Sequence, residues 1–300
     1  MDEKGNPMPP TLIDGKAMSD SLLLELTQTV QQFRANTGRD PGLAVVLVGS
    51  NAASQFYVEA KKRACHRVGI TSYDYRLAAS DGQGALLELI DHLNQDPDIH
   101  GILVQLPLPK GFDEQLVIER IQPSKDVDGF HPMNLGRVFQ GLSGFRSCTP
   151  YGVVRLLEHQ GIATAGAHVV IVGRSNIVGK PLAALLVQKG VDATVTLAHS
   201  KTRHLSHVTQ SADILVAAIG VPEFITGAMV KEGAVVIDVG INRIEDRRQP
   251  KGYRIVGDVD FDSVSPRCSA ITPVPGGVGP MTIAMLLNNT VEAARSHAGI

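Results

Sequence analysis

Short runs of apolar residues, many of them β-branched, alternate with stretches of helical periodicity along most of the chain. The apolar runs are nearly continuous, which is typical of parallel strands that are covered on both faces. Strands are predicted over residues 43–48, 101–106, 168–172, 193–197, 213–217 and 234–239. Helices are predicted over residues 54–68, 85–94, 150–160, 179–189 and 281–297. This alternation predicts an α/β protein built on doubly wound parallel sheets.

Two irregular segments interrupt the alternation. Residues 122–150 are rich in Gly, Asp, Ser and Pro and carry no sustained period, so we predict a long functional loop leading into an interdomain connection. Residues 272–280 precede a last helix with apolar positions such as Leu286 and Leu287. We predict that this helix crosses back and packs on the first domain.

The length of 300 residues suits one large or two medium domains. We expect two α/β domains with a cleft between them. The first covers residues 1–147 and is completed by the returning helix, residues 280–300. The second covers residues 148–279.

The composition argues against several classes of protein. Hydrophobic residues make up 43% of the chain and charged residues 19%, as in ordinary soluble globular proteins. The formal net charge of -2 gives no electrostatic reason to expect a nucleic acid or a membrane as a partner. The N-terminus resembles neither a signal peptide nor a transit peptide, and no apolar run is long enough to cross a bilayer. The three cysteines are widely spaced and are interpreted as small buried apolar residues, so we expect a cytoplasmic protein.

The predicted strand over residues 168–172 leads into a turn that begins at Gly173 and reaches a helix at Gly179. A strand, a glycine-bearing turn and a helix N-terminus form an anion site, because free amide donors and the helix dipole converge there. The turn departs from G-x-G-x-x-G, since Ser175 stands at the second glycine position. The pattern alone leaves open a dinucleotide-binding turn of a Rossmann-like domain and an ordinary strand–helix connection.

The end of the next predicted strand bears on the choice of dinucleotide. NAD-preferring sites place an acidic side chain there, but this strand is followed by His199, Ser200 and Lys201 with no carboxylate. Arg174, Ser200 and Lys201 could instead bind a 2′-phosphate through charged or polar donors. The sequence therefore favours NADP over NAD, although His199 and Lys201 also suit solvated positions.

A lysine lies on the apolar side of the predicted helix over residues 54–68, for which Ser54 is the expected N-cap. One helical stripe contains Tyr57, Ala60, Lys61, Ala64 and Val68. Lys61 could extend from the edge of this stripe to solvent, or pair with a core carboxylate. Alternatively, a partly desolvated ammonium group has a lowered pKa and serves as an acid or base near neutral pH.

Two further polar side chains are candidates for the same site. Gln105 ends an apolar predicted strand, and ligands of parallel sheets bind beyond the carboxyl ends of the strands. Asp128 lies in the loop over residues 122–150. Taken singly, Gln105 also suits a strand-end capping group and Asp128 a turn former. The ten histidines form no recognisable ligand pair, so no metal site is expected.

Taken together, these motifs resemble the bifunctional methylenetetrahydrofolate dehydrogenase/methenyltetrahydrofolate cyclohydrolase family. The matching segments follow the family order and are residues 57–61, 101–109, 125–131, 148–150, 173–181, 193–196, 199–200, 238–242 and 272–282. Two positions depart from the family pattern: Ala198 stands where many members have Cys, and Ser147 where Pro is frequent. Neither position belongs to a proposed catalytic group.

The resemblance implies a role for each candidate residue. Lys61 would be the central catalytic residue of the cyclohydrolase, with Tyr57 packing against the folate, Gln105 tuning the protonation of the lysine and Asp128 anchoring the pterin. The implied substrate-binding residues are Tyr57, Ser54, Asp128, Pro275, Gly276 and Gly277. The implied cofactor-binding residues are Thr149, Gly173, Arg174, Ser175, Ile177, His199, Ser200 and Ile241.

The resemblance also implies an activity: NADP-dependent oxidation of methylenetetrahydrofolate to the methenyl form, and hydrolysis of the methenyl form to 10-formyltetrahydrofolate. A homodimer that binds tetrahydrofolate derivatives is implied as well. Two alternatives remain, namely a dehydrogenase without the hydrolytic activity or acting on another small substrate, and a nucleotide-sensing protein without turnover. The joint presence of Lys61, Gln105 and Asp128 argues against the sensor, because a sensor needs no buried base.

Overall fold

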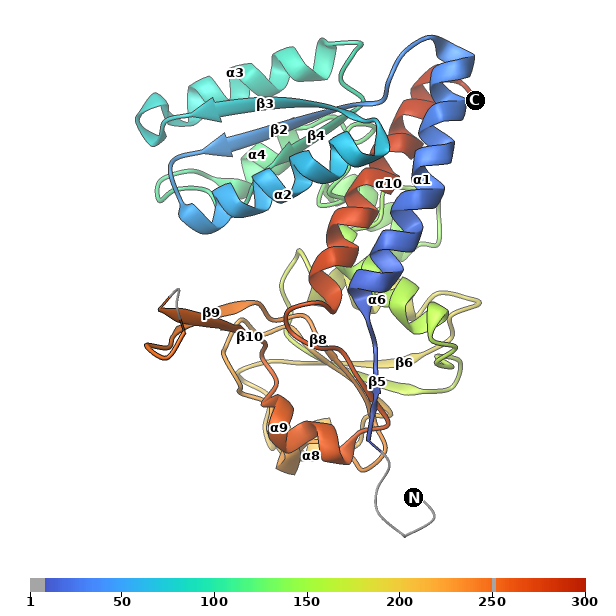
Figure 1. Cartoon of the computed structure of the whole chain (residues 1–300), viewed down its shortest axis with the longest axis vertical. Coiled ribbons are helices and arrows are strands. Elements are labelled where there is room, and N and C mark those ends of the chain that lie inside the picture. Colours follow the sequence, from blue (N-terminus) through green and yellow to red (C-terminus); the bar gives the residue numbers. More distant parts are fainter. Residues whose placement is uncertain (1–8, 250–251) are drawn as a thin grey trace. The chain divides into compact units, whose positions relative to one another are not determined.

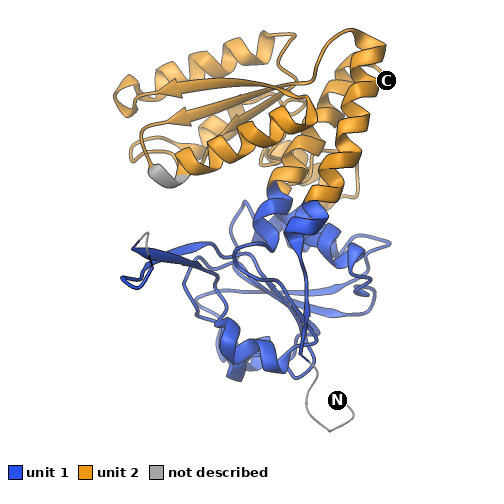
Figure 2. Cartoon of the chain, viewed as in Figure 1, with its two compact units in different colours: residues 1–19, 149–282 blue, residues 20–148, 283–300 orange. Residues whose placement is uncertain are grey.

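The computed structural model of the protein describes residues 9–249 and 252–300. These residues form two compact units, shown in different colours in Figure 2. Unit 1 contains the described residues up to Ser19 together with Thr149–Thr282, and unit 2 contains Asp20–Cys148 and Ile283–Ile300. The residues before Asp20 belong with unit 1 because the first strand, β1 (Thr11–Leu12), pairs with β11 (Ala270–Ile271).

Unit 2 is built on a parallel sheet of three strands in the order β3-β2-β4. The strands are β2 (Gly42–Val48), β3 (Thr71–Leu77) and β4 (Gly101–Val104). The central strand β2 is buried along its whole length, as a strand covered on both faces must be. The helices are α1 (Gly15–Thr37), which starts in unit 1, and α2 (Ala52–Val68), α3 (Gly82–Gln95), α4 (Glu114–Arg120) and α5 (Pro132–Phe139).

The two faces of this sheet carry different helices (Figure 1). Alternate residues of β2, among them Ala44 and Val46, pack in one apolar cluster with buried residues of α3 and α4. The intervening residues of β2 point to the opposite face, because successive strand side chains alternate. Helix α2 lies on that face, and it brings its side chains to the carboxyl ends of the strands.

Unit 1 contains a parallel sheet of six strands in the order β1-β11-β8-β7-β5-β6. The other strands of this sheet are β5 (His168–Val172), β6 (Thr194–Ala198), β7 (Ile214–Ala217) and β8 (Val235–Asp238). The helices are α6 (Cys148–His159), α7 (Gly179–Leu186), α8 (Leu205–Thr209) and α9 (Phe261–Val264), and a separate antiparallel pair is formed by β9 (Asn242–Glu245) and β10 (Tyr253–Val256). Because β5 has β6 on one side and β7 on the other, the strand order reverses at β5, where such sheets bind ligands.

The last helix, α10 (Val278–Ala298), confirms the predicted return to the first domain. The chain enters this helix in unit 1 and leaves it in unit 2, and Leu286 and Leu287 are buried. The doubly wound parallel architecture is likewise confirmed, since every pair in both main sheets is parallel. Within the described residues, no helix is both long enough and apolar enough to span a membrane.

Two local predictions were wrong. Residues 122–150 are not a continuous loop, because they contain α5, which starts with Pro132 after His131 as N-cap; the His131 ring accepts a bond from Met133 N–H. Ser54 is not the N-cap of α2, since the helix already begins at Ala52. The Asn51 side chain instead accepts the Ser54 N–H at 3.1 Å and serves as the cap.

Candidate active site

Lys61 lies on the buried side of α2, as its place in the apolar stripe predicted. Its side chain is 8% exposed, and Val58 and Cys65 are buried on the same side of the helix. The neighbouring Lys62 faces outward and forms an ion pair with Asp74 at 2.5 Å. A buried ammonium group is costly, so Lys61 requires polar partners.

The first of these partners is Gln105, which directly follows β4. Lys61 Nζ donates to Gln105 Oε1 at 2.9 Å. The Gln105 amide is oriented by its own backbone, because Nε2 donates to the Leu106 carbonyl at 2.7 Å. Its main-chain N–H donates to Val46 of the central strand at 2.9 Å. The end of the sheet therefore presents an amide oxygen to the lysine in a fixed direction.

The second partner is the carboxylate of Asp128, which interacts electrostatically with Lys61. Burial lowers the pKa of Lys61, and the negative charge of Asp128 acts against this shift. Burial raises the pKa of Asp128, while the charge of Lys61 and a hydrogen bond from Cys148 act in the opposite direction. Both shifts favour the neutral forms of the two groups.

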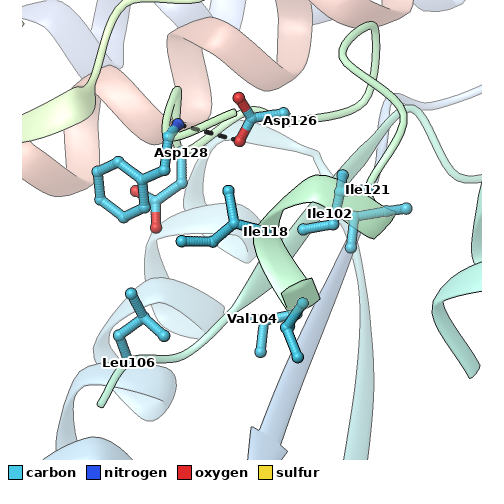
Figure 3. Close-up of a pocket in the computed structure, with 9 residues that line it drawn as sticks. Ile102, Val104, Leu106, Ile118, Ile121, Asp126 and Asp128 are labelled. Carbon is cyan, nitrogen blue, oxygen red and sulfur yellow. Dashed lines mark hydrogen bonds between the residues drawn. The ribbon is translucent and has the colours of Figure 1, made fainter. Parts of the chain in front are cut away.

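Asp128 also lines a small pocket, drawn in Figure 3. Most of its other lining residues are apolar and come from β4, α4 and the loop after them; they are Ile102, Val104, Leu106, Val117, Ile118, Ile121 and Phe130. Asp126 lies at the pocket too, but its carboxylate accepts the backbone N–H groups of Phe130 and His131. Asp126 thus stabilises the turn, while Asp128 interacts with Lys61.

The lowered pKa of Lys61 has a consequence for stability. Between that value and the ordinary value of 10.5, the unfolded chain binds a proton that the folded chain has released, so stability rises with pH in this window. Lys61→Met removes this dependence. Near neutral pH, we expect the free energy of unfolding of the variant to be at least as large as that of the unaltered protein. This difference in free energy, the margin, should shrink as the pH approaches 10.5. Urea unfolding across this pH range measures the margin, and a margin that grew with pH would contradict the desolvation of Lys61.

Tyr57 and Ser54 lie one and two turns before Lys61 on α2. Ser54 is buried, and Tyr57 is half-buried with its ring in edge contact with Phe56. Burial raises the pKa of Tyr57, so its hydroxyl stays protonated at neutral pH. The structure therefore brings Lys61, Gln105 and Asp128 together in unit 2, with Tyr57 one turn before Lys61 on α2.

The glycine-bearing turn after β5 has the close backbone approach that a phosphate-binding turn requires. Gly173 has φ 133°, and a Cβ added there would lie 2.1 Å from the Ala218 carbonyl oxygen. A Cβ at Gly179 would lie 2.1 Å from the carbonyl oxygen of Gly173 itself. Neither position tolerates a side chain, so both glycines are required for the turn to fold back on itself.

Ser175 accounts for the departure from the usual glycine pattern. Its hydroxyl accepts the N–H groups of Val178 and Gly179 at 3.1 and 3.4 Å, and thereby caps the start of α7. Arg174 and Ser200 are exposed at the ends of β5 and β6. The exposed apolar side chains of Ile177 and Ile241 are available to contact a ring system.

The remaining predicted residues also lie in unit 1. His199 has its backbone N–H bound by Thr202, and Thr149 pairs through its hydroxyl with Thr282 at 2.9 Å. The segment Pro275, Gly276 and Gly277 precedes α10, and the Gly276 carbonyl accepts a bond from Lys16 N–H at 2.9 Å. Across residues 9–249 and 252–300, no three His, Cys, Asp or Glu side chains are grouped as metal ligands would be.

Cys148 is a residue of the site that the sequence interpretation missed. Its thiol lies 3.3 Å from the Val127 carbonyl oxygen and interacts with the Asp128 carboxylate. Burial raises the pKa of this thiol well above its ordinary value, so it is a hydrogen-bond donor rather than a nucleophile. All three cysteines are buried, and the one sequence signal that separated Cys148 from Cys65 and Cys268 was its place in the matching segment 148–150.

Both halves of the chain match models of one protein family. Residues 13–128 match the catalytic domain of tetrahydrofolate dehydrogenase/cyclohydrolase. Residues 147–298 match the NAD(P)-binding domain of tetrahydrofolate dehydrogenase/cyclohydrolase. The first match ends at residue 128 in the turn that carries Asp128, and the second begins at residue 147, directly before α6.

Individual relatives agree over nearly the whole length. The chain is 56% identical over 288 residues to the bifunctional protein FolD of Chlorobium phaeobacteroides, covering 95% of this chain and 98% of that one. The crystal structure of the FolD dehydrogenase/cyclohydrolase from Campylobacter jejuni is 50% identical, with a TM-score of 0.90 and coverage of 95% and 99%. The Trypanosoma brucei FolD structure, complexed with NADP cofactor and an inhibitor, is 38% identical with a TM-score of 0.93, and covers 98% of this chain and all (100%) of that one. The chain therefore belongs to the tetrahydrofolate dehydrogenase/cyclohydrolase family.

Proposed function

We propose that the protein oxidises 5,10-methylenetetrahydrofolate to 5,10-methenyltetrahydrofolate with NADP⁺, and hydrolyses the product to 10-formyltetrahydrofolate. The observation that carries this proposal is the buried Lys61, which donates to Gln105 at 2.9 Å and interacts with Asp128. A protein that only bound a nucleotide would have no use for such a group. Membership of the family supports both activities.

In the hydrolytic step, water adds to the carbon between N5 and N10 of the methenyl cation and loses a proton. The bond from this carbon to N5 then breaks as the new hydroxyl group loses its proton and becomes the formyl C=O, and N5 takes up a proton. We assign the proton transfers to Lys61, because burial lowers its pKa from the ordinary value of 10.5 and so makes the neutral amine more accessible as a base. Gln105 holds the amine in place, and Asp128 binds the pterin.

In the oxidative step, a hydride leaves the one-carbon bridge for the nicotinamide ring of NADP⁺, and binding and orientation are the protein's contribution. The turn at Gly173 to Gly179 would hold the pyrophosphate. The residues around it fit NADP⁺, since Arg174 and Ser200 are exposed and residues 193–202 contain no carboxylate. We assign Thr149, Ser175, Ile177, His199 and Ile241 to the same site, and Ser54, Tyr57, Pro275, Gly276 and Gly277 to the folate.

An absorbance assay of the purified protein tests the proposal directly. Methylenetetrahydrofolate is supplied with NADP⁺ or NAD⁺ in parallel, and reduced cofactor and methenyl product are followed together. Methenyltetrahydrofolate is supplied separately, and its disappearance is followed. We expect turnover in both assays and a preference for NADP⁺. The absence of both activities would refute the proposal, while oxidation without hydrolysis would support a simple dehydrogenase.

The choice of cofactor can be changed at Arg174. Arg174→Ala removes a cationic donor from the proposed 2′-phosphate site, and a hydrogen bond to a charged group contributes about 1.5–3 kcal/mol. We expect the KM for NADP⁺ to rise about 10- to 100-fold, with little change for NAD⁺. Lys180→Ala is the matched control, because Lys180 bonds Asn176 within its own turn. An equal increase in KM for NADP⁺ and NAD⁺ would show that Arg174 does not bind the 2′-phosphate.

We further propose that the protein acts in the cytoplasm as a homodimer. The implied partners are tetrahydrofolate derivatives, with neither nucleic acid nor membrane. The formal net charge of -2 and the lack of a membrane-spanning helix among the described residues support this assignment. Light scattering of the purified protein tests the homodimer, and a mass of one chain would contradict it.

A further inference from the structure

The turn that carries Asp128 is held at three consecutive backbone carbonyls. The Val127 carbonyl accepts from Asn289 Nδ2 at 2.8 Å. The Asp128 carbonyl accepts from Cys148 N–H at 3.3 Å, and the Gly129 carbonyl accepts from the Ser147 hydroxyl at 2.7 Å. The backbone is therefore fixed before, at and after the residue whose carboxylate faces Lys61.

Asn289 differs from the other two donors, Ser147 and Cys148, because it lies on the last helix, α10. Its side chain is 1% exposed. Besides Val127, its Nδ2 donates to the Arg146 carbonyl at 3.0 Å and lies 3.7 Å from Cys148 Sγ. A primary amide has two N–H groups, so it can bind both carbonyls at once. One side chain thus joins the Asp128 turn, the segment before α6 and the last helix, all within unit 2.

The packing around the turn leaves little freedom for another arrangement. A Cβ added to Gly101 would lie 2.6 Å from the Val127 side chain, which is itself fully buried. Gly129 has φ 74°, and a Cβ there would lie 2.6 Å from the backbone of Arg146 and Ser147. The turn is closely packed on both sides. Loss of Asn289 would leave the Val127 carbonyl with only the weak Cys148 thiol donor at 3.3 Å, so the turn is expected to shift.

We propose that Asn289 is a positioning residue for the folate reactions: by fixing the turn at Val127, it directs the Asp128 carboxylate toward Lys61 and the pterin. Asn289 itself contacts neither Lys61 nor Asp128 through its side-chain donors, and it acts through the backbone. The inference rests on the proposed function and deepens it, because it concerns how the same site is aligned.

The decisive comparison is between two adjacent buried residues of α10. Asn289→Ala removes the donors to the turn, whereas Thr290→Ala removes a hydroxyl that donates only to Leu286 of its own helix at 2.8 Å. We expect Asn289→Ala to raise the KM for methenyltetrahydrofolate about tenfold, because the Asp128 carboxylate that binds the pterin is no longer held in position. We expect Thr290→Ala to leave it unchanged. Both variants should bind NADP⁺ as the unaltered protein does, which dinucleotide fluorescence titration measures.

The pH profile of hydrolysis provides a readout that a purely structural role would not change. The charge of Asp128 raises the proton affinity of Lys61, so a displaced carboxylate should move the lysine-dependent limb of the profile to lower pH in Asn289→Ala alone. An unchanged KM and an unchanged profile in Asn289→Ala would overturn the inference. The same changes in Thr290→Ala would overturn it as well.

Ser147→Ala provides a second, milder test on the same turn, and it decides the matter if Asn289→Ala does not fold. It removes only the donor to Gly129, and we expect a KM increase of a few-fold with the same shift of the pH profile. If Asn289→Ala is unfolded and Ser147→Ala changes neither the KM nor the pH profile, the inference is overturned. Failure of the proposed function is recognised separately, because the unaltered protein would then lack both activities.

Discussion

Lys61→Met is expected to abolish the hydrolysis of methenyltetrahydrofolate and to leave the NADP⁺-dependent oxidation measurable. A well-placed general acid–base group contributes about 10²–10⁴-fold to a rate, so kcat for hydrolysis should fall by at least that range. Methionine has a similar length and no charge, and it suits a side chain that is 8% exposed. The measurement is the loss of methenyltetrahydrofolate absorbance, corrected for the uncatalysed reaction.

Lys62→Met is the matched control for this experiment. Lys62 is the next residue of the same helix, but it faces outward and pairs with Asp74. Its replacement should change neither activity by more than a small factor, because exposed ion pairs contribute at most about 1 kcal/mol. Full hydrolytic activity in Lys61→Met would show that the lysine takes no part in the hydrolysis. Equal losses in both variants would point to damage of the helix rather than of the chemistry.

Gly179→Val is expected to have the opposite selectivity, with oxidation lost and hydrolysis retained. A Cβ at this position would lie 2.1 Å from the Gly173 carbonyl oxygen, so the turn must open to accept any side chain. Displacing backbone of this kind costs about 1–3 kcal/mol for each strained residue, and at least two residues are involved. We expect NADP⁺ affinity to fall by about 100-fold or more. Fluorescence titration with reduced NADP measures this change without the folate substrate.

Gly190→Ala separates a local effect on the turn from a general loss of stability in unit 1. Gly190 has φ 92°, so alanine there is strained, but a Cβ would meet no atom within 4 Å. This control should lower the melting temperature slightly and leave NADP⁺ affinity intact. If Gly179→Val bound NADP⁺ with unchanged affinity, the dinucleotide would not occupy this turn.

The buried face of α2 was predictable because its chemistry is local. The period of the apolar positions placed Lys61 inside the stripe, and its bond to Gln105 follows from the place of Gln105 at the end of a buried strand. Asp128 lies in the loop over residues 122–150, so its interaction with Lys61 was implied only by the family resemblance. Strand β3 was not among the predicted elements. It lies at the edge of the sheet and is only partly buried, so its residues alternate and include Asp74 and Arg76.

Other features depend on contacts that no local pattern contains. The cap of α2 is Asn51 rather than Ser54, because the helix begins earlier than the apolar stripe does. The hydrogen bond between Cys148 and the Asp128 turn, and that between Asn289 and Val127, join residues that lie far apart in the chain. Periodicity identifies which face of an element is buried, but it does not identify which polar groups meet there.

The bond from Asn289 to Val127 joins residues 162 positions apart, and the whole of Thr149–Thr282 is translated between them. During synthesis, the sheet of unit 2 can form early, since domains generally fold as their residues emerge. Its Asp128 turn must nevertheless wait for the last helix, after the entire neighbouring unit has left the ribosome. A nascent chain can therefore have a folded three-stranded sheet while its turn still lacks the Asn289 donor, and hydrolytic competence should emerge late in biogenesis.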